Sequence, residues 1–303
     1  MKHRRLAILT GALVPLVLAA GMQASAWLGG PTAVLGQAVY QLHRIDEAQF
    51  PPPPGQPVFL LVVGSDARPG EAAGRGDALH LIGVNPEAGR ATILNIPRDS
   101  WVPVPGRGTD KINSANLVGG PRLQAAAVAQ LVGVDIPFVI STDFAGFTAM
   151  VDELGGVDVD VPFRMADANS GAFFQAGPNH LDGFGALAFS RNRGIPDGDL
   201  RRTEHQGLLI LAALAKLRSE QPDTLKTMRW LSVLLRNGRF DGAGLVDLYH
   251  LAKLALSIDV ANVRAVTVPG SPGQAGNQSV VFLSPAASGL FADFRDDAIL
   301  QSH

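Results

Sequence analysis

One continuous apolar run, Val58–Val63, constrains the fold of this chain more than any other segment. The run contains no polar side chain and ends at Gly64. Strands that are buried on both faces read as unbroken apolar runs, whereas half-exposed strands alternate apolar and polar residues. We therefore expect a central strand of a sheet that carries helices on both of its faces.

Further segments alternate between strand and helix patterns. Residues 79–84 and 91–96 are β-rich and flank a turn at 85–89, which predicts a hairpin and a mixed sheet. Helices are predicted at 123–132, 142–154, 181–189, 203–217, 224–236, 245–257 and 285–298, and strands at 138–141, 157–161, 263–268 and 280–283, whereas 163–180 reads as a loop. The alternation predicts an α/β fold with a mixed central β-sheet sandwiched between helices.

The N-terminus predicts a segment that engages a membrane. Lys2, His3, Arg4 and Arg5 precede the apolar run Leu6–Met22. A run of this length with a basic flank in front suits a single-pass membrane helix whose first residues stay in the cytoplasm. The alternative is a cleaved secretory signal, because Ala24-Ser25-Ala26 matches a small-residue cleavage site. Both interpretations place the rest of the chain outside the cytoplasmic membrane, either anchored or secreted.

Composition and proline content set the expected domains. We expect a cytoplasmic tip and anchor at 1–26, a stalk and linker at 27–57 that includes Pro51–Pro54, and one extracytoplasmic catalytic domain at 58–303.

The 303 residues are 47% hydrophobic and 17% charged, which is typical of a globular protein. A formal net charge of -2 argues against nucleic-acid binding, and the absence of cysteine excludes thiol chemistry.

Arginine and aspartate gather in two stretches, residues 64–113 and 190–206. Arginine holds phosphate oxygens in a planar fork, and aspartate holds hard divalent cations. If the fold joined the two stretches, they would form a site for a pyrophosphate and its metal. We predict that basic side chains from both stretches bind the phosphates. Gln206 lies one helical turn after Arg202 and so on the same face of its helix. The predicted phosphate-binding residues are Arg75, Arg98, Lys111, Arg191, Arg193, Arg202 and Gln206.

The charged segments resemble the LytR–CpsA–Psr family of cell-wall ligases. The resemblance runs in order from about Val58 to Leu217, through Val63–Arg68, Gly74–Leu79, Asn95–Ser100, Asp110–Ala115, Thr142–Phe147, Val151–Val157, His180–Gly183 and Ser190–Arg193. It implies a phosphotransferase that moves a glycopolymer from a polyprenyl-pyrophosphate carrier in the membrane onto peptidoglycan, through a phosphodiester bond. The family's α-β-α domain is then the expected fold.

The resemblance also implies site roles. Asp66 and Asp77 would hold Mg²⁺, or Mn²⁺ in its place. The residues expected to act in catalysis are Arg98, Asp99, Arg191, Arg193 and Arg202. Apart from the resemblance, a base must deprotonate the attacking sugar hydroxyl; Asp99 is the first candidate and Asp199 the second, and either could instead only orient an arginine. One departure is His205, where family members commonly carry arginine.

Alternatives remain open for the site and for the function. Asp66 and Asp77 could merely cap turns, and an arginine beside an aspartate, as at Arg98-Asp99, is often a surface ion pair. The function could instead be that of a non-catalytic, regulatory polyprenyl-pyrophosphate-binding protein, or of a hydrolase. Teichoic acid, capsule and arabinogalactan present the same pyrophosphate. A chain rich in Ala, Gly and Arg with few Lys favours a GC-rich genome and so arabinogalactan.

Overall fold

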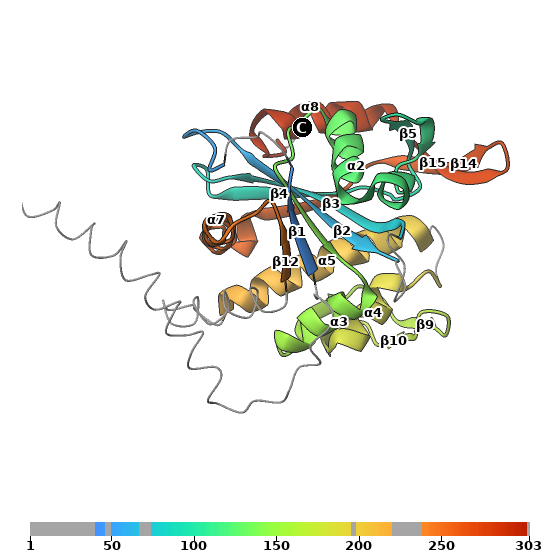
Figure 1. Cartoon of the computed structure of the whole chain (residues 1–303). Coiled ribbons are helices and arrows are strands. Elements are labelled where there is room, and N and C mark those ends of the chain that lie inside the picture. The colour runs from blue at the N-terminus through green and yellow to red at the C-terminus, as the bar shows by residue number, and fades with distance from the viewer. Residues whose placement is uncertain (1–39, 46–49, 67–73, 195–197, 220–237, 302–303) are drawn as a thin grey trace, which may run out of the picture. The chain divides into compact units, whose positions relative to one another are not determined.

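A seven-stranded mixed sheet forms the centre of the structure (Figure 1). The computed structural model describes residues 40–45, 50–66, 74–194, 198–219 and 238–301. The strand order is β12-β1-β7-β2-β3-β4-β13. The strands are β1 (Tyr40–Arg44), β2 (Val58–Ser65), β3 (Gly76–Asn85), β4 (Arg90–Asn95), β7 (Phe138–Thr142), β12 (Gly238–Asp241) and β13 (Val263–Thr267).

The pairing of these strands confirms the mixed sheet. β2 is antiparallel to β3 and parallel to β7, while β4 is antiparallel to β3 and parallel to β13. Leu61 and Val63 of β2 are fully buried, as the apolar run predicted. Because β2, β4, β7 and β13 point the same way, their carboxyl ends share one edge of the sheet, where α/β folds commonly place their sites.

Helices cover both faces of the sheet (Figure 1). α2 (Ser114–Val132) and α8 (Pro285–Asp297) lie on one face, and α3 (Phe144–Glu153), α4 (Gly183–Arg191), α5 (Gly198–Ser219) and α7 (Leu245–Ser257) on the other. The largest buried cluster lies between the sheet and α2 with α8, and a second lies among α3, α4, α5 and β8 (Val157–Val161). Apolar burial on both faces therefore stabilises the sandwich.

Four two-stranded sheets complete the described fold. They pair β5 (Trp101–Val104) with β6 (Gly108–Lys111), β8 with β11 (Gly177–Leu181), β9 (Met165–Asp167) with β10 (Ala172–Phe174), and β14 (Gly270–Ala275) with β15 (Gln278–Leu283). The loop expected at 163–180 is wrong, because β9, β10 and most of β11 lie there. Their short strands carry Gly, Asn and Ala, which do not signal a strand.

Two other segments differ from expectation. Tyr40–Arg44, placed in a stalk by its weak pattern, is strand β1 between β12 and β7 in the central sheet. The helix expected from Leu123 begins at Ser114 and is interrupted at Gly120, whose φ of 64° and ψ of -163° only glycine adopts readily. Pro121 then restarts the helix, because its ring presets a helical φ.

The apolar run Leu6–Met22 and the helix expected at 224–236 lie outside the described residues. Among the helices that the structure describes, none is both long enough and apolar enough to cross a bilayer.

Candidate active site

The two charged stretches meet at Arg98, which lies three residues after the end of β4. Arg98 Nη1 donates a hydrogen bond to Asp77 Oδ1 over 2.5 Å. Arg98 Nη2 lies 3.7 Å from Asp199 Oδ1, in the second stretch. Residues about a hundred positions apart in the sequence thus form one cluster at the carboxyl edge of the sheet.

Asp199 connects the arginines of the cluster. It lies in the first turn of α5, and its Oδ1 is 3.2 Å from Arg202 Nη2 and 3.6 Å from Arg193 Nη2. Its other oxygen, Oδ2, is buried and has no hydrogen-bond partner among the described residues. Asp199 therefore holds three guanidinium groups close together, which their mutual repulsion would otherwise oppose.

A glycine lets α5 approach the sheet beside Arg98. A Cβ at Gly207 would lie 2.6 Å from the side-chain Nδ2 of Asn95, the last residue of β4. That distance is far below van der Waals contact, so a larger residue would push the helix away. Gly207 thus brings the first turns of α5, with Asp199 and Arg202, to the end of β4.

A β-bulge places Asp77 in the cluster. Gly64 pairs with Ala78, yet Ser65 pairs with Gly76, so Asp77 is the extra residue on β3 and has no partner of its own. Bulges of this kind redirect a side chain away from the regular alternation of a strand. The carboxylate of Asp77 is accordingly free to pair with Arg98.

Asp66 and Arg75 lie at the same end of the β2–β3 pair. Arg75 donates its backbone N–H to Asp66 Oδ1 over 2.6 Å, and Asp66 donates its own to the carbonyl oxygen of Arg75 over 3.2 Å. The Arg75 side chain is exposed. Asp66 thus lies beside the bulge that carries Asp77.

The donor set of these two aspartates fits a magnesium ion. Each carboxylate uses one oxygen in the contacts above, which leaves the other oxygen without a partner among the described residues. Within the same residues, no group of three or more His, Cys, Asp or Glu gathers as a protein-made metal cage. Mg²⁺ needs no such cage, since it is commonly bound by one or two carboxylates together with water and phosphate oxygens.

Arg202 and Arg98 have buried guanidinium nitrogens that can bind an anion. Burial lowers the pKa of Arg202 to about 10, with repulsion from Arg98 and Arg193 acting in the same direction and Asp199 opposing them. The group stays cationic at neutral pH. Its Nε is buried and makes no hydrogen bond among the described residues, and neither does Arg98 Nε; Arg202 Nη2 lies in ion-pair range of Asp199 but also makes no hydrogen bond there. Unsatisfied buried donors are costly, and phosphate oxygens would satisfy them.

Arg98 retains its positive charge more strongly than Arg202 does. Burial acts to lower the pKa of Arg98, but the carboxylates of Asp77, Asp199 and Asp99 outweigh it, so that the pKa lies above its ordinary value. Arg98 therefore remains a fixed cation at the centre of the cluster.

The remaining candidate residues are placed as follows. Lys111 Nζ lies 3.2 Å from Asp99 Oδ1, and Arg98 Nε lies 3.6 Å from Asp99 Oδ2, so Asp99 contacts two cations. Arg191 is not joined to the cluster by a described ion pair; its guanidinium lies over the ring of Phe144 at 5.2 Å. Gln206 donates to the carbonyl oxygen of Ser190 over 3.3 Å and so ties the second stretch to α5.

Two residues that sequence reasoning missed shape the second stretch. Asp167 is buried, and its Oδ2 accepts the backbone N–H of Arg193 over 3.1 Å. That hydrogen bond lowers the pKa of Asp167, so its carboxylate stays charged and fixes the backbone of Arg193. Asn192 is also buried and accepts the backbone N–H of Gly194 over 3.0 Å. Asp167 lies in the segment that was expected to be a loop, and Asn192 lies between two of the predicted phosphate-binding arginines.

Two buried histidines lie near the cluster without joining it. His80 hydrogen-bonds Asn95 through Nδ1 over 2.8 Å, and burial lowers its pKa to about 4. His205 packs against the rings of Phe189 and Phe163, at 4.8 Å and 5.7 Å, and burial also lowers its pKa to about 4, with Arg201 acting in the same direction. The residue that replaces the family's arginine thus contacts aromatic rings.

These histidines predict destabilisation by acid. The unfolded chain binds protons below about pH 6.5, whereas both folded-state pKa values are about 4, so stability is lost as the pH falls through this window. Each histidine should account for about 3 kcal/mol of that loss. Urea unfolding at neutral pH and near pH 4 should show that His205→Leu removes about half of the histidine-dependent loss. An unchanged pH profile in His205→Leu would contradict this.

Comparisons with known proteins agree with the fold. The profile of the LytR–CpsA–Psr family (LytR_cpsA_psr) matches residues 39–289. The probable cell wall biosynthesis protein LcpB of Corynebacterium glutamicum is 35% identical over 225 residues, which are 69% of this chain and 53% of LcpB. TagU of Bacillus mycoides, a polyisoprenyl-teichoic acid–peptidoglycan teichoic acid transferase, is 39% identical over 163 residues, 53% of each chain.

A solved structure supports the same assignment of the fold. The LytR-CPS2A-psr family protein YwtF (TagT), with bound octaprenyl pyrophosphate, superposes with a TM-score of 0.63 at 21% identity, over 89% of this chain and all of that one. The chain spans about half the length of the curated relatives it matches. The family profile covers most of the chain, including both charged stretches, and the chain belongs to the LytR–CpsA–Psr family.

Proposed function

We propose that this protein is a Mg²⁺-dependent phosphotransferase that moves a glycopolymer from a polyprenyl-pyrophosphate carrier onto peptidoglycan, forming a phosphodiester. The observation that carries the proposal is the meeting of Arg98, Arg193 and Arg202 around Asp199, with unsatisfied guanidinium nitrogens inside the cluster. Relatives named as teichoic acid transferases support the reaction class, and TagT with octaprenyl pyrophosphate supports the donor class.

The arginines would bind the diphosphate and stabilise the charge that develops on it. A hydroxyl of the acceptor sugar attacks the phosphorus that bears the glycopolymer. The new P–O bond forms as the anhydride P–O bond breaks, and polyprenyl monophosphate leaves with the bonding electrons. Arg98, Arg202 and Arg193, which meet around Asp199, would neutralise the leaving phosphate, since preorganised cations stabilise such transition states.

Asp66 and Asp77 would hold the metal beside the diphosphate, where Mg²⁺ neutralises phosphate charge when bound. The hydroxyl proton must pass to a base. Asp99 and Asp199 both lie in contact with Arg98, at 3.6 Å and 3.7 Å, and we retain both as candidates. We assign Arg75 and Arg191 to the outer part of the phosphate site, because their exposed side chains can reach a large headgroup.

We further propose that the catalytic domain acts outside the cytoplasmic membrane, tethered through residues 1–26. The basic residues before Leu6–Met22 support this topology, and a lipid-linked donor requires access to the membrane. Among donor polymers, arabinogalactan is our first candidate on composition, ahead of teichoic acid and capsule.

One reaction tests the proposal. The full chain in detergent is incubated with a synthetic lipid-linked oligosaccharide and Mg²⁺, with and without peptidoglycan glycan strands. We expect glycan-linked product only when glycan is present. Free sugar phosphate released equally in both reactions would instead identify a hydrolase, and unchanged donor that nevertheless binds would identify a non-catalytic binding protein.

A further inference from the structure

The side chain of Arg191 is held by an aromatic ring and not by a carboxylate. The three arginines of the cluster lie 3.2 Å, 3.6 Å and 3.7 Å from Asp199 Oδ1. Arg191, the last residue of α4, makes no ion pair among the residues that the structure describes, and its guanidinium carbon lies 5.2 Å from the centre of the Phe144 ring. A guanidinium within about 6 Å of a ring face is attracted by the ring's quadrupole. The ring thus holds Arg191 where a carboxylate holds the other arginines.

The Phe144 ring is not part of the hydrophobic core. It is half-buried and belongs to none of the four buried clusters in the described part of the chain. Phe147, three positions later on the same helix, does pack into the cluster among α3, α4, α5 and β8. Core side chains are recognised by membership of such clusters. The ring of Phe144 therefore contacts Arg191 without also filling the core.

A helix cap fixes the position of Phe144. Strand β7 ends at Thr142, on the edge of the sheet that carries the site, and Asp143 follows as the N-cap of α3. The Asp143 side chain accepts the backbone N–H of Gly146 over 2.7 Å, which holds the first turn of the helix in place. Phe144 is the first residue of that turn. Its ring is therefore presented from a fixed backbone at the carboxyl end of β7.

A glycine brings α4 against α3, so that Arg191 can reach this ring. The two helices pack against each other (Figure 1). A Cβ at Gly183, the first residue of α4, would collide with the carbonyl oxygen of Thr148. Gly183 also donates its backbone N–H to Asp152 Oδ1 over 2.7 Å. These contacts fix the start of α4 on α3, and its last residue then meets Phe144.

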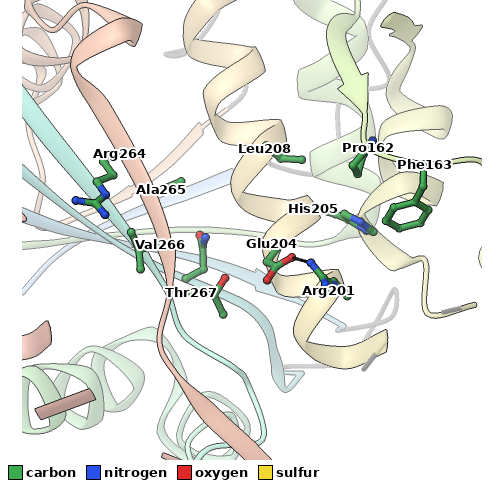
Figure 2. Close-up of a pocket in the computed structure, with 11 residues that line it drawn as sticks. Pro162, Phe163, Arg201, Glu204, His205, Leu208, Arg264, Ala265, Val266 and Thr267 are labelled. Atoms are coloured by element: carbon green, nitrogen blue, oxygen red, sulfur yellow. Dashed lines mark hydrogen bonds and ion pairs between the residues drawn. The ribbon is translucent and has the colours of Figure 1, made fainter. Parts of the chain in front are cut away.

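An aromatic partner leaves the charge of Arg191 available to an anion. Arg201 on α5 pairs with Glu204 over 2.9 Å (Figure 2), and that carboxylate offsets its charge and occupies an N–H donor. A phenyl ring carries no net charge, so Arg191 keeps its full charge and its N–H donors for phosphate oxygens. Arg193, two residues further on, already lies in the cluster at 3.6 Å from Asp199. Arg191 is thus an oriented cation beside the phosphate site.

We propose that Phe144 is a positioning residue for the transfer reaction, whose ring holds the guanidinium of Arg191 in place for the diphosphate of the lipid-linked donor. The inference rests on the proposed function and adds a residue that acts through Arg191. An arginine side chain loses conformational entropy when it binds a ligand. A ring that orders the side chain beforehand removes part of that cost, and the donor then binds more tightly.

A double-mutant cycle on donor binding tests the proposal without turnover. Farnesyl pyrophosphate is titrated with Mg²⁺ into the full chain in detergent by calorimetry. We expect Arg191→Ala to weaken binding about 10-fold and Phe144→Leu about 3- to 5-fold. Phe144→Tyr keeps an aromatic ring and should bind like the wild type. Added to Arg191→Ala, Phe144→Leu should have no further effect, because the ring acts through the guanidinium.

The matched control is Phe147→Leu, which removes a ring of the same size from the core side of the same helix. It should lower the melting temperature and leave the affinity for farnesyl pyrophosphate unchanged. Equal weakening by Phe144→Leu with and without Arg191 would overturn the proposal and make Phe144 a structural residue. Wild-type affinity in Arg191→Ala would also overturn it, and would leave the arginines around Asp199 as the phosphate site.

Kinetics separate this inference from the proposed function. In the transfer reaction, Phe144→Leu should raise the KM for the lipid-linked donor and leave the KM for the glycan unchanged, whereas a general loosening of the fold would raise both and contradict the proposal. If the wild type binds farnesyl pyrophosphate with the expected dependence on Phe144 but forms no glycan-linked product, the positioning role stands and the proposed transfer is wrong. Absence of farnesyl pyrophosphate binding by the wild type would overturn both.

Discussion

Arg98→Ala is expected to lower the rate of glycopolymer transfer by about a thousandfold, as the removal of a charge-stabilising arginine does in other phosphoryl-transfer sites. Arg98 contacts Asp77, Asp99 and Asp199, and so joins both charged stretches at one point. Its removal deprives the diphosphate of a central cation and releases Asp77 from its fixed position. Rates are compared under saturating donor and glycan.

Matched variants decide whether charge or geometry carries the effect. Arg98→Lys keeps the cation but not the fork, so we expect an intermediate loss of about 10- to 100-fold. Arg90→Ala removes an exposed arginine from the first position of β4, at the end of that strand far from Arg98, and should leave the rate unchanged. The melting temperature of Arg98→Ala should fall by only a few degrees, because Asp77 and Asp99 retain access to water. A variant that folds and transfers at the wild-type rate would remove Arg98 from the site.

The sequence predicted those parts of the fold in which local pattern and burial agree. The apolar run at Val58–Val63 became the buried part of β2, and the helix predicted at 245–257 is α7 with the same bounds. In both segments the pattern of apolar residues directly reports the buried surface. Asp143 also accepts the backbone N–H of Gly146 at the start of α3, as a helix cap should.

Other parts of the fold depend on partners that are distant in the chain. Strand β1 is paired by β7 and β12, which lie about a hundred and two hundred residues away, and its own residues give only a weak strand pattern. Loop-like composition likewise hid β9 and β10, whose pairing compensates for low β-propensity. Long-range pairing of this kind leaves little trace in a single sequence.

The candidate site was likewise predictable from the sequence only in part. The residue types in the two stretches indicated that arginines and aspartates would serve a phosphate, and Arg98, Arg193, Arg202 and Lys111 do meet around Asp99 and Asp199. The central position of Asp199 could not be foreseen, since it requires α5 to lie against Asn95 at Gly207. The bulge that frees Asp77 is equally invisible, because it depends on a register shift between β2 and β3.

Asp77→Asn is expected to reduce Mg²⁺-dependent transfer by about a hundredfold or more, since a bound cation contributes several kcal/mol to transition states of this kind. The bulge at Asp77 lies beside Asp66, and each carboxylate has one oxygen without a partner among the described residues. The amide of asparagine can still accept a hydrogen bond from Arg98, so the variant removes the metal-binding charge with little change in shape.

Metal binding is measured independently of activity by electron paramagnetic resonance of Mn²⁺, which replaces Mg²⁺ at oxygen sites. We expect Asp77→Asn and Asp66→Asn each to weaken Mn²⁺ binding in the presence of a short polyprenyl pyrophosphate, because phosphate oxygens complete the coordination. Asp160→Asn, an exposed change on β8, is the control and should bind Mn²⁺ like the wild type. Equal Mn²⁺ affinity in all four proteins would assign Asp77 to the positioning of Arg98 alone, and the cation would then have to be removed from the proposed mechanism.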